Sequence, residues 1–280
     1  MKKIPIVSLA VMLSASFCHQ AHSEIAPVVN TIKAIKHDKA ALAKQLSNPI
    51  AALISLPLQF NYDENIGVND KGERWTLNVQ PVAPFELNED WNVISRTILP
   101  LISQKNVSAN GASESGIGDI VQSVFFSPKA PTKNGWIWGA GPVLLLPTGS
   151  DKFLTADKWG IGPTAVALKQ DGPWTYGGLT NHIVSVAGDD NRGDINATFI
   201  QPFLSYTTPA AITYTLNAEA TYDWEGEQWT VPVYAGISKV LKIDNQLISV
   251  AGGLRYWAES TDNSPQGLSF RVSLTFMFPK

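Results

Sequence analysis

The feature that most constrains the fold is a strict alternation of apolar and polar residues over long segments. In the segment 212–224 every second residue is apolar, and Glu219 falls in the interleaved polar set. The segment 268–278 repeats the pattern, with Arg271 on its polar side. A period of two is that of a β-strand with one apolar face. The sequence therefore predicts an all-β protein.

Segments of this kind recur along the chain and are separated by residues typical of turns. They are long, because globular strands usually have about 5–6 residues, and a tilted membrane-spanning strand needs about 9–11. Their length therefore favours strands that cross a membrane. We predict about twelve such strands, over residues 56–65, 73–85, 90–102, 117–127, 135–147, 158–169, 173–187, 194–207, 212–224, 227–240, 246–258 and 267–278.

The connections and the tryptophans support this interpretation. Short connections, such as 208–211, tend to alternate with longer polar ones, such as 103–116, and outer-membrane barrels have short periplasmic turns and long external loops. All nine tryptophans fall near strand ends, as expected of aromatic girdles at the two membrane interfaces. The predicted girdle residues are Trp75, Trp159, Trp224, Trp229 and Trp257 at the long-loop ends, and Trp91, Trp136, Trp138 and Trp174 at the short-turn ends.

A sheet in lipid has to close on itself, because every backbone polar group must be paired. We therefore predict a transmembrane, antiparallel, up-and-down β-barrel over residues 56–280, located in the cell outer membrane. An even number of strands leaves both chain ends on the periplasmic side. A soluble β-sandwich and a barrel of about ten or fourteen strands are the alternatives.

The N-terminus has the layout of a secretory signal peptide, predicted over residues 1–23. Lys2 and Lys3 precede an apolar stretch at 4–17, and small residues follow at Ala21 and Ser23. The one cysteine lies in this segment, so the mature chain has no disulfide and no cysteine-based zinc site.

Residues 24–55 differ from the rest because apolar residues recur there at helical spacing, from Val28 and Ile32 to Leu42 and Leu46. We predict a short N-terminal helical segment. Two roles are open for it: a plug in the barrel mouth or lumen, or a periplasmic segment that serves only as a spacer or a chaperone contact.

Several long motifs resemble one known family. They include LSNPIAALISLPLQFNYD at 46–63, GWIWGAGPVLLLPTGSD at 135–151 and TYDWEGEQWTVP at 221–232. The chain resembles, over roughly residues 44–280, the family labelled "MetA-pathway of phenol degradation". Its members are often called transporters and sometimes mislabelled neuromedin U. The resemblance implies an outer-membrane barrel with aromatic-compound pathways as one context, and it brings no catalytic or ligand residues.

One departure concerns the C-terminus. Outer-membrane barrels usually end on an aromatic residue that the assembly machinery reads, whereas Phe278 is followed here by Pro279 and Lys280.

Enzyme chemistry has little support in the sequence. His182 and Ser185 are three residues apart and so face opposite sides of a strand. Thr180 shares the face of His182, but nothing would orient it as a nucleophile. His37 is the other histidine after the signal peptide. We therefore predict no enzymatic activity and no catalytic residue. A barrel enzyme acting on lipid is the alternative, which His182→Ala would silence.

Metal, cofactor and nucleic-acid sites are not expected either. Residues 189–194 resemble part of a calcium loop but lack its length and its terminal glutamate. Paired glycines such as Gly160 and Gly162 do not fit a phosphate-binding loop. The net charge of −3 excludes a basic nucleic-acid surface.

The polar residues expected to face the lumen are the candidate functional residues. Arginine or lysine facing lipid would cost about 2–4 kcal/mol at the midplane, which favours inward placement. Two roles are open for these side chains: an eyelet that selects solutes, or ion pairs that only brace a narrow barrel. The candidates are Arg96, His182, Asn217, Glu219, Arg255 and Arg271.

The function that the family resemblance implies is passage of small molecules, hydrophobic or aromatic ones among them, across the outer membrane, in the manner of a porin-like transporter. The alternatives are a non-conducting structural or interaction barrel with a filled lumen, and the lipid-acting enzyme. The expected partners are outer-membrane lipid and lipopolysaccharide, the barrel-assembly machinery and an unidentified small solute.

Overall fold

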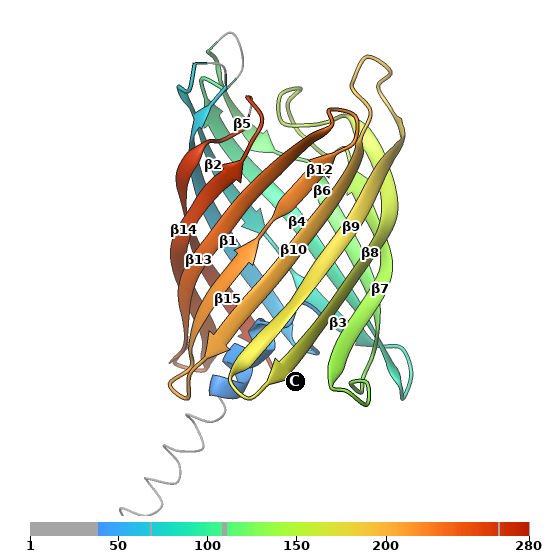
Figure 1. Cartoon of the computed structure of the whole chain (residues 1–280), viewed down its shortest axis with the longest axis vertical. Helices are drawn as coiled ribbons and strands as arrows, with labels where there is room; N and C mark the ends of the chain where they lie inside the picture. The colour runs from blue at the N-terminus through green and yellow to red at the C-terminus, as the bar shows by residue number, and fades with distance from the viewer. Residues whose placement is uncertain (1–38, 68, 108–110, 263, 280) are drawn as a thin grey trace, which may run out of the picture.

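The computed structural model describes residues 39–67, 69–107, 111–262 and 264–279. The predicted signal peptide, and the part of the N-terminal helical segment before residue 39, lie outside the described residues. Figure 1 shows one closed sheet that forms a tall barrel, with a short helix at the end where the last strand finishes.

The barrel has twelve antiparallel strands, built from fifteen β segments because some strands are interrupted. The segments are β1 Ile54–Ile66, β2 Gly72–Val79, β3 Val82–Glu86, β4 Trp91–Lys105, β5 Ser113–Ile117, β6 Ile120–Pro128, β7 Trp136–Leu146, β8 Lys158–Asp171, β9 Trp174–Gly188, β10 Asn196–Thr207, β11 Ile212–Ala218, β12 Ala220–Asp223, β13 Gln228–Ile243, β14 Gln246–Glu259 and β15 Gly267–Phe278.

The first and last strands close the barrel. β1 pairs with β15 in a continuous antiparallel register from Ile54 opposite Phe278 to Tyr62 opposite Phe270. Every other strand pairs with its neighbours in the chain. The sequence prediction of an all-β, up-and-down barrel of about twelve strands is thus confirmed.

The interruptions split three predicted strands. The segment 73–85, predicted as one strand, forms β2 and β3, because Pro81 has no N–H to donate to the ladder. Pairing nevertheless continues across the break, since Gln80 N donates to Pro57 O at 2.9 Å. The predicted strand 117–127 becomes β5 and β6, which are separated by Gly118 and Asp119. The predicted strand 212–224 becomes β11 and β12, which are separated by Glu219. The strand at β5 also begins earlier than predicted.

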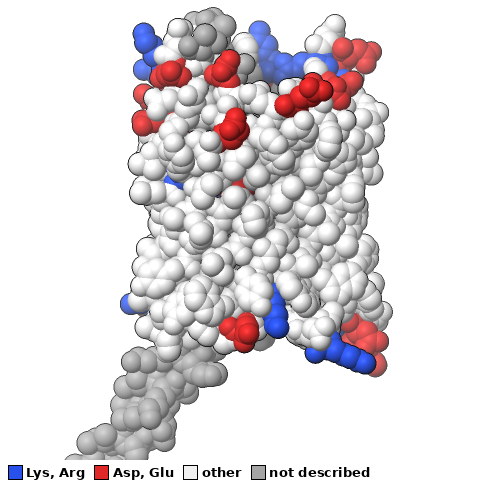
Figure 2. Space-filling model, viewed as in Figure 1, with Lys and Arg blue, Asp and Glu red and all other residues white. Residues whose placement is uncertain are grey.

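The outer wall is apolar between two charged ends. Figure 2 shows lysine, arginine and acidic residues gathered at the top and bottom, with a broad band almost free of charge between them. Large exposed apolar side chains cover this band, among them Phe60, Leu101, Leu204, Leu216, Leu254 and Phe270. An apolar band on a closed barrel is what a lipid bilayer requires. The predicted outer-membrane localisation is therefore confirmed.

Aromatic rings pack together at both rims of the band. At the rim near the chain ends, Trp91 and Trp138 meet edge to face with ring centroids 5.8 Å apart, and Trp174 meets Tyr206 at 4.8 Å. At the other rim, Tyr222 contacts Trp229 at 5.0 Å. The two predicted bands thus contain real aromatic clusters.

One girdle residue needs correction. Trp257 does not face lipid: its indole N–H donates to Ser269 at 3.0 Å and to Asp63 at 3.3 Å, both inside the barrel. The reason is the strand period, since Trp257 lies two residues from the inward-facing Arg255 and therefore shares its face.

The described part of the short helix covers residues 39–46. It lies at the end of the barrel where β1 begins and β15 ends (Figure 1). Leu42, Ala43 and Leu53 are buried against Ala211 and Met277 of the barrel. Further inside, Ile50 packs with inward side chains of the barrel wall such as Phe125. Within the described part of the chain, no helix is long and apolar enough to cross a membrane.

Candidate functional site

The candidate site is the lumen, which is lined by one set of alternating side chains from each strand. On β15, for example, Ser269, Arg271 and Ser273 point inward, while Phe270 and Val272 are exposed on the outer wall. The alternation that made these strands recognisable in the sequence is therefore what brings their polar residues together.

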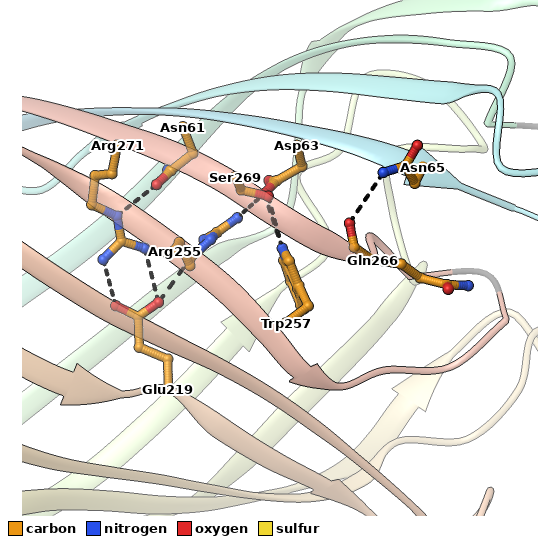
Figure 3. A network of polar contacts seen from close by, with 9 residues as sticks. All are labelled: Asn61, Asp63, Asn65, Glu219, Arg255, Trp257, Gln266, Ser269 and Arg271. Carbon is orange, nitrogen blue, oxygen red and sulfur yellow. Dashed lines mark hydrogen bonds and ion pairs between the residues drawn. The ribbon is translucent and has the colours of Figure 1, made fainter.

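A network of ion pairs lies on one side of the lumen. Arg255 of β14 pairs with Asp63 of β1, and both side chains are buried. The Arg255 guanidinium also lies over the ring of Trp257, 4.7 Å from its centroid. Figure 3 shows Asp63 between Arg255 and Trp257, with Ser269 beside them.

The second half of the network joins Glu219 to Arg271. Both carboxylate oxygens of Glu219 accept hydrogen bonds from Arg271, at 2.7 and 2.8 Å. Arg271 also donates from Nε to Asn61 Oδ1 at 2.7 Å, and Arg255 approaches the same carboxylate at 4.0 Å. The planar guanidinium of Arg271 thus donates to Glu219 with two N–H groups and to Asn61 with another, and such an arrangement is strong and geometrically fixed. We call Asn61, Asp63, Glu219, Arg255 and Arg271 the charge network (Figure 3).

Arg96 faces the same lumen, across from Glu219 of the charge network. It projects from β4, which is on the opposite side of the ring of strands from β11 and β12. Its guanidinium donates to Gln80 Oε1 at 3.3 Å. No carboxylate of the described residues forms an ion pair with it. Arg96 is thus bound by a neutral group, whereas Arg255 and Arg271 are bound by carboxylates.

Two adjoining cavities occupy the lumen around Arg96. The mouth cavity, of about 300 Å³, is lined by Leu46, Asn48 and other residues of the N-terminal segment together with barrel residues. The inner cavity, of about 350 Å³, reaches Glu219 and Arg271. Both are lined by Arg96, Gln201 and Asn217 among others. Either volume is enough for several water molecules or a small solute.

Residues 39–53 occupy the mouth at the end of the barrel that carries the chain ends. Lys44 donates from Nζ to Gly172 O at 2.7 Å, and Gln170 donates from Nε2 to Lys44 O at 2.8 Å. Both contacts tie the helix to the turn between β8 and β9. Together with the buried Leu42, Ala43 and Leu53, they seat the segment in the mouth. We call residues 39–53 the mouth segment.

A loop narrows the other end of the lumen. Residues 147–157, between β7 and β8, fold against the inner face of β5, and Leu154 is buried there. The carboxylate of Asp119 holds this inward loop by accepting hydrogen bonds from Gly149 N at 3.0 Å, Thr155 Oγ1 at 2.7 Å and Ala156 N at 2.6 Å.

The neighbouring connection between β9 and β10 supports the inward loop. Arg192 donates from Nε to Ala156 O at 3.4 Å. Close by, Lys158 pairs with Asp194 at 3.0 Å. The hydrogen bond from Lys158, helped by one from Ser185, holds the pKa of the Asp194 carboxyl below its usual value.

The structure places the predicted lumen residues at different positions. Arg96, Asn217, Glu219 and Arg271 line the cavities, and Arg255 belongs to the charge network. Asn217 Oδ1 is buried and has no hydrogen-bond partner among the described residues.

His182 is not brought to the lumen. It shares the outer face of β9 with the exposed Trp174 and Thr180. Its Nδ1 lies 2.8 Å from Thr198 Oγ1, which also accepts the indole N–H of Trp224 at 2.9 Å. The reason is that β9 has polar residues on both faces, so its alternation did not fix which one faces inward.

Sequence reasoning missed Asp63 and Gln80. Both are polar residues at alternate positions of predicted strands, Gln80 on the face of Asn78, and that signal could have found them. In the part of the chain that the structure describes, no group of three or more histidine, cysteine or acidic side chains is placed to hold a metal ion.

Comparison with known proteins gives a fold but no family. No family model matches the sequence, and no curated protein matches it. Among solved structures, an outer membrane channel from Pseudomonas putida F1 is similar over 81% of this chain and 96% of that chain, with a TM-score of 0.63 and 13% identity. The chain therefore has the fold of an outer-membrane channel, while the finer family label from the sequence motifs has no support from these comparisons.

The prediction that the chain is not an enzyme needs correction. The similar structures also include outer membrane phospholipase A from Escherichia coli, with a TM-score of 0.49 and 11% identity over 82% of this chain and 91% of that chain. That structure is named as an enzyme, so the prediction of no enzymatic activity is withdrawn. A likeness at this level assigns no activity to this chain.

Proposed function

We propose that this barrel passes small molecules across the outer membrane and that the mouth segment closes it between passages. The observation that carries the proposal is the position of the cavities. They lie inside a closed barrel, they adjoin one another, and the mouth segment forms the floor of one of them. A solute that enters the lumen meets polar side chains first and the mouth segment last.

The seat of the mouth segment suits a removable closure. Apart from the direct strand connection at residue 54, it is held by two apolar clusters, one at Leu42 and one at Ile50, and by two hydrogen bonds from Lys44 and Gln170. It contributes no strand to the sheet. The barrel wall would therefore remain fully paired if the segment swung out.

Single-channel conductance in planar bilayers tests the proposal, with the mature chain refolded and its heat-modifiable migration checked first. Ala43→Glu places a carboxylate in the apolar cluster, where Ala43 is 3% exposed. An unpaired buried charge is costly, so the segment should leave its seat and openings should become frequent. Ala41→Glu is the matched control, because Ala41 is exposed on the same helix.

The expected result is rare openings in the wild type and in Ala41→Glu, and frequent openings in Ala43→Glu. Silence in all three folded barrels would contradict the proposal and favour a structural or interaction barrel with a filled lumen. Equal openings in all three would leave a pore but reject the closure.

The remaining parts of the proposal follow from the sequence. We infer export through the signal peptide at 1–23, insertion by the barrel-assembly machinery and contact with lipopolysaccharide at the long-loop rim. The family resemblance suggests hydrophobic or aromatic solutes, and the apolar side chains of the inner cavity, Leu179 and Phe199 among them, support this.

A further inference from the structure

The charged residues among the lining of the two cavities are Arg96, Arg271 and Glu219, so this lining carries one more positive than negative charge. Arg255 is paired with Asp63, and Arg271 is paired with Glu219. Arg96 faces the same space with only the carbonyl oxygen of Gln80 as an acceptor. A guanidinium with several free N–H donors beside a cavity is suited to a planar anion such as a carboxylate.

The neutral polar groups near Arg96 are also free to bind. Gln59 and Asn78, on β1 and β2, line the inner cavity, and neither side chain forms a hydrogen bond with another described residue. A carboxamide offers N–H donors as well as an acceptor. These side chains can therefore supply further donors to an anion that Arg96 attracts, and the carboxylate that lines the same cavity, Glu219, is bound by Arg271.

Apolar side chains also line the cavities. Val121, Leu179 and Phe199 line the inner cavity, and Phe203 lines the mouth cavity. Leu179, Phe199 and Phe203 come from β9 and β10, across the ring from β4, whereas Val121 comes from β6, which is beside β4. A solute that spans the lumen thus meets donors at one end and an apolar surface at the other.

We propose that the lumen binds small organic anions, with a carboxylate held by Arg96 and an apolar body packed against Leu179 and Phe199. This rests on the proposed function for its biological use, because it names the solute class of the same lumen. Binding itself does not require the mouth segment to move.

Equilibrium binding to the folded, full-length barrel in detergent tests the proposal by calorimetry with three probes. Hexanoate has both the charge and the apolar body, hexanamide lacks the charge, and acetate lacks the body. The wild type should bind hexanoate at least about tenfold more tightly than either of the others, because one charge-assisted contact or a few buried methylenes account for such a factor. If the wild type binds all three probes with equal affinity, the proposal is overturned before any variant is tested.

Two substitutions of Arg96 then locate the site. Arg96→Gln should weaken hexanoate by about tenfold to a hundredfold and leave hexanamide unchanged, while Arg96→Lys should keep most of the preference for the anion. Lys242→Gln is the matched control, since it removes one positive charge from an exposed position at the barrel end. If Arg96→Gln and Lys242→Gln bind hexanoate alike, the site is not at Arg96 and the proposal fails.

The outcomes separate this inference from the proposed function. Hexanoate binding that depends on Arg96, in a barrel that stays silent after Ala43→Glu, would support the anion site and reject passage. Conductance after Ala43→Glu, with no preference for hexanoate over hexanamide, would support passage and overturn the anion site.

Discussion

The pair between Glu219 and Arg271 should contribute substantially to the stability of the barrel, and Glu219→Gln measures that contribution. The substitution keeps the shape of the side chain but removes the charge that two guanidinium N–H groups bind at 2.7 and 2.8 Å. Arg271 is left buried without an opposite charge in contact, because the new amide oxygen and Asn61 Oδ1 are neutral acceptors. The barrel should therefore lose stability even though no volume is removed.

The magnitude follows from burial. Removing one partner of a buried ion pair costs about 3–5 kcal/mol. The Glu219 side chain is 20% exposed to the cavity and that of Arg271 is 6% exposed, so water can reach Arg271 partly and the lower end applies. About 3 kcal/mol corresponds to roughly a hundredfold change in the unfolding equilibrium.

Reversible urea unfolding of the barrel in lipid vesicles, followed by tryptophan fluorescence, gives the free energy of unfolding. Glu86→Gln is the matched control, because it makes the same chemical change in the pair with Lys129, where Glu86 is 74% exposed and the atoms are 3.5 Å apart. An exposed pair contributes less than about 1 kcal/mol. If the two variants lose the same stability, the buried pair does not brace the barrel and the reasoning is refuted.

Two further predictions concern the inward loop and the wall. Asp119→Asn weakens the acceptor of three loop hydrogen bonds, so hydrogen exchange of residues 147–157 should become about tenfold faster by mass spectrometry; an unchanged rate would show that other contacts hold the loop. Gly162→Ala should abolish the heat-modifiable barrel on gels, because its Cβ would lie 1.6 Å from a backbone oxygen of β9, whereas Gly252→Ala, with open space at the Cβ, should fold normally. Normal folding of both variants would contradict the close approach of β8 and β9.

The fold was predictable because a barrel wall repeats a simple rule. One face meets lipid and the other meets the lumen, so the alternation around Glu219 and Arg271 specified both the strands and the inward position of these charges. The same rule, applied strictly from Arg255, would have placed Trp257 inside. The prediction gave more weight to the position of Trp257 near a strand end than to the face on which the alternation places it, and this produced the error.

The pairing of the charges was not predictable. Asp63 and Arg255 are far apart in the sequence and meet because β1 closes on β15, next to β14. The register of that closure depends on the whole ring, not on any local pattern. The position of the inward loop at 147–157 was also not predictable, because a loop has no periodic pattern that would indicate on which side of the wall it lies.

The two roles considered for the lumen charges, bracing and selection, are divided between different residues. Arg255 and Arg271 each pair with a carboxylate from a non-adjacent strand, and a charge that is already paired has little left to offer a solute. Arg96 faces the same lumen, where its hydrogen-bond partner is the neutral Gln80, and the cavities lie beside it. Bracing should therefore depend on the network and selection on Arg96, so that Glu219→Gln changes mainly the stability of the barrel and Arg96→Gln mainly the solutes that it binds.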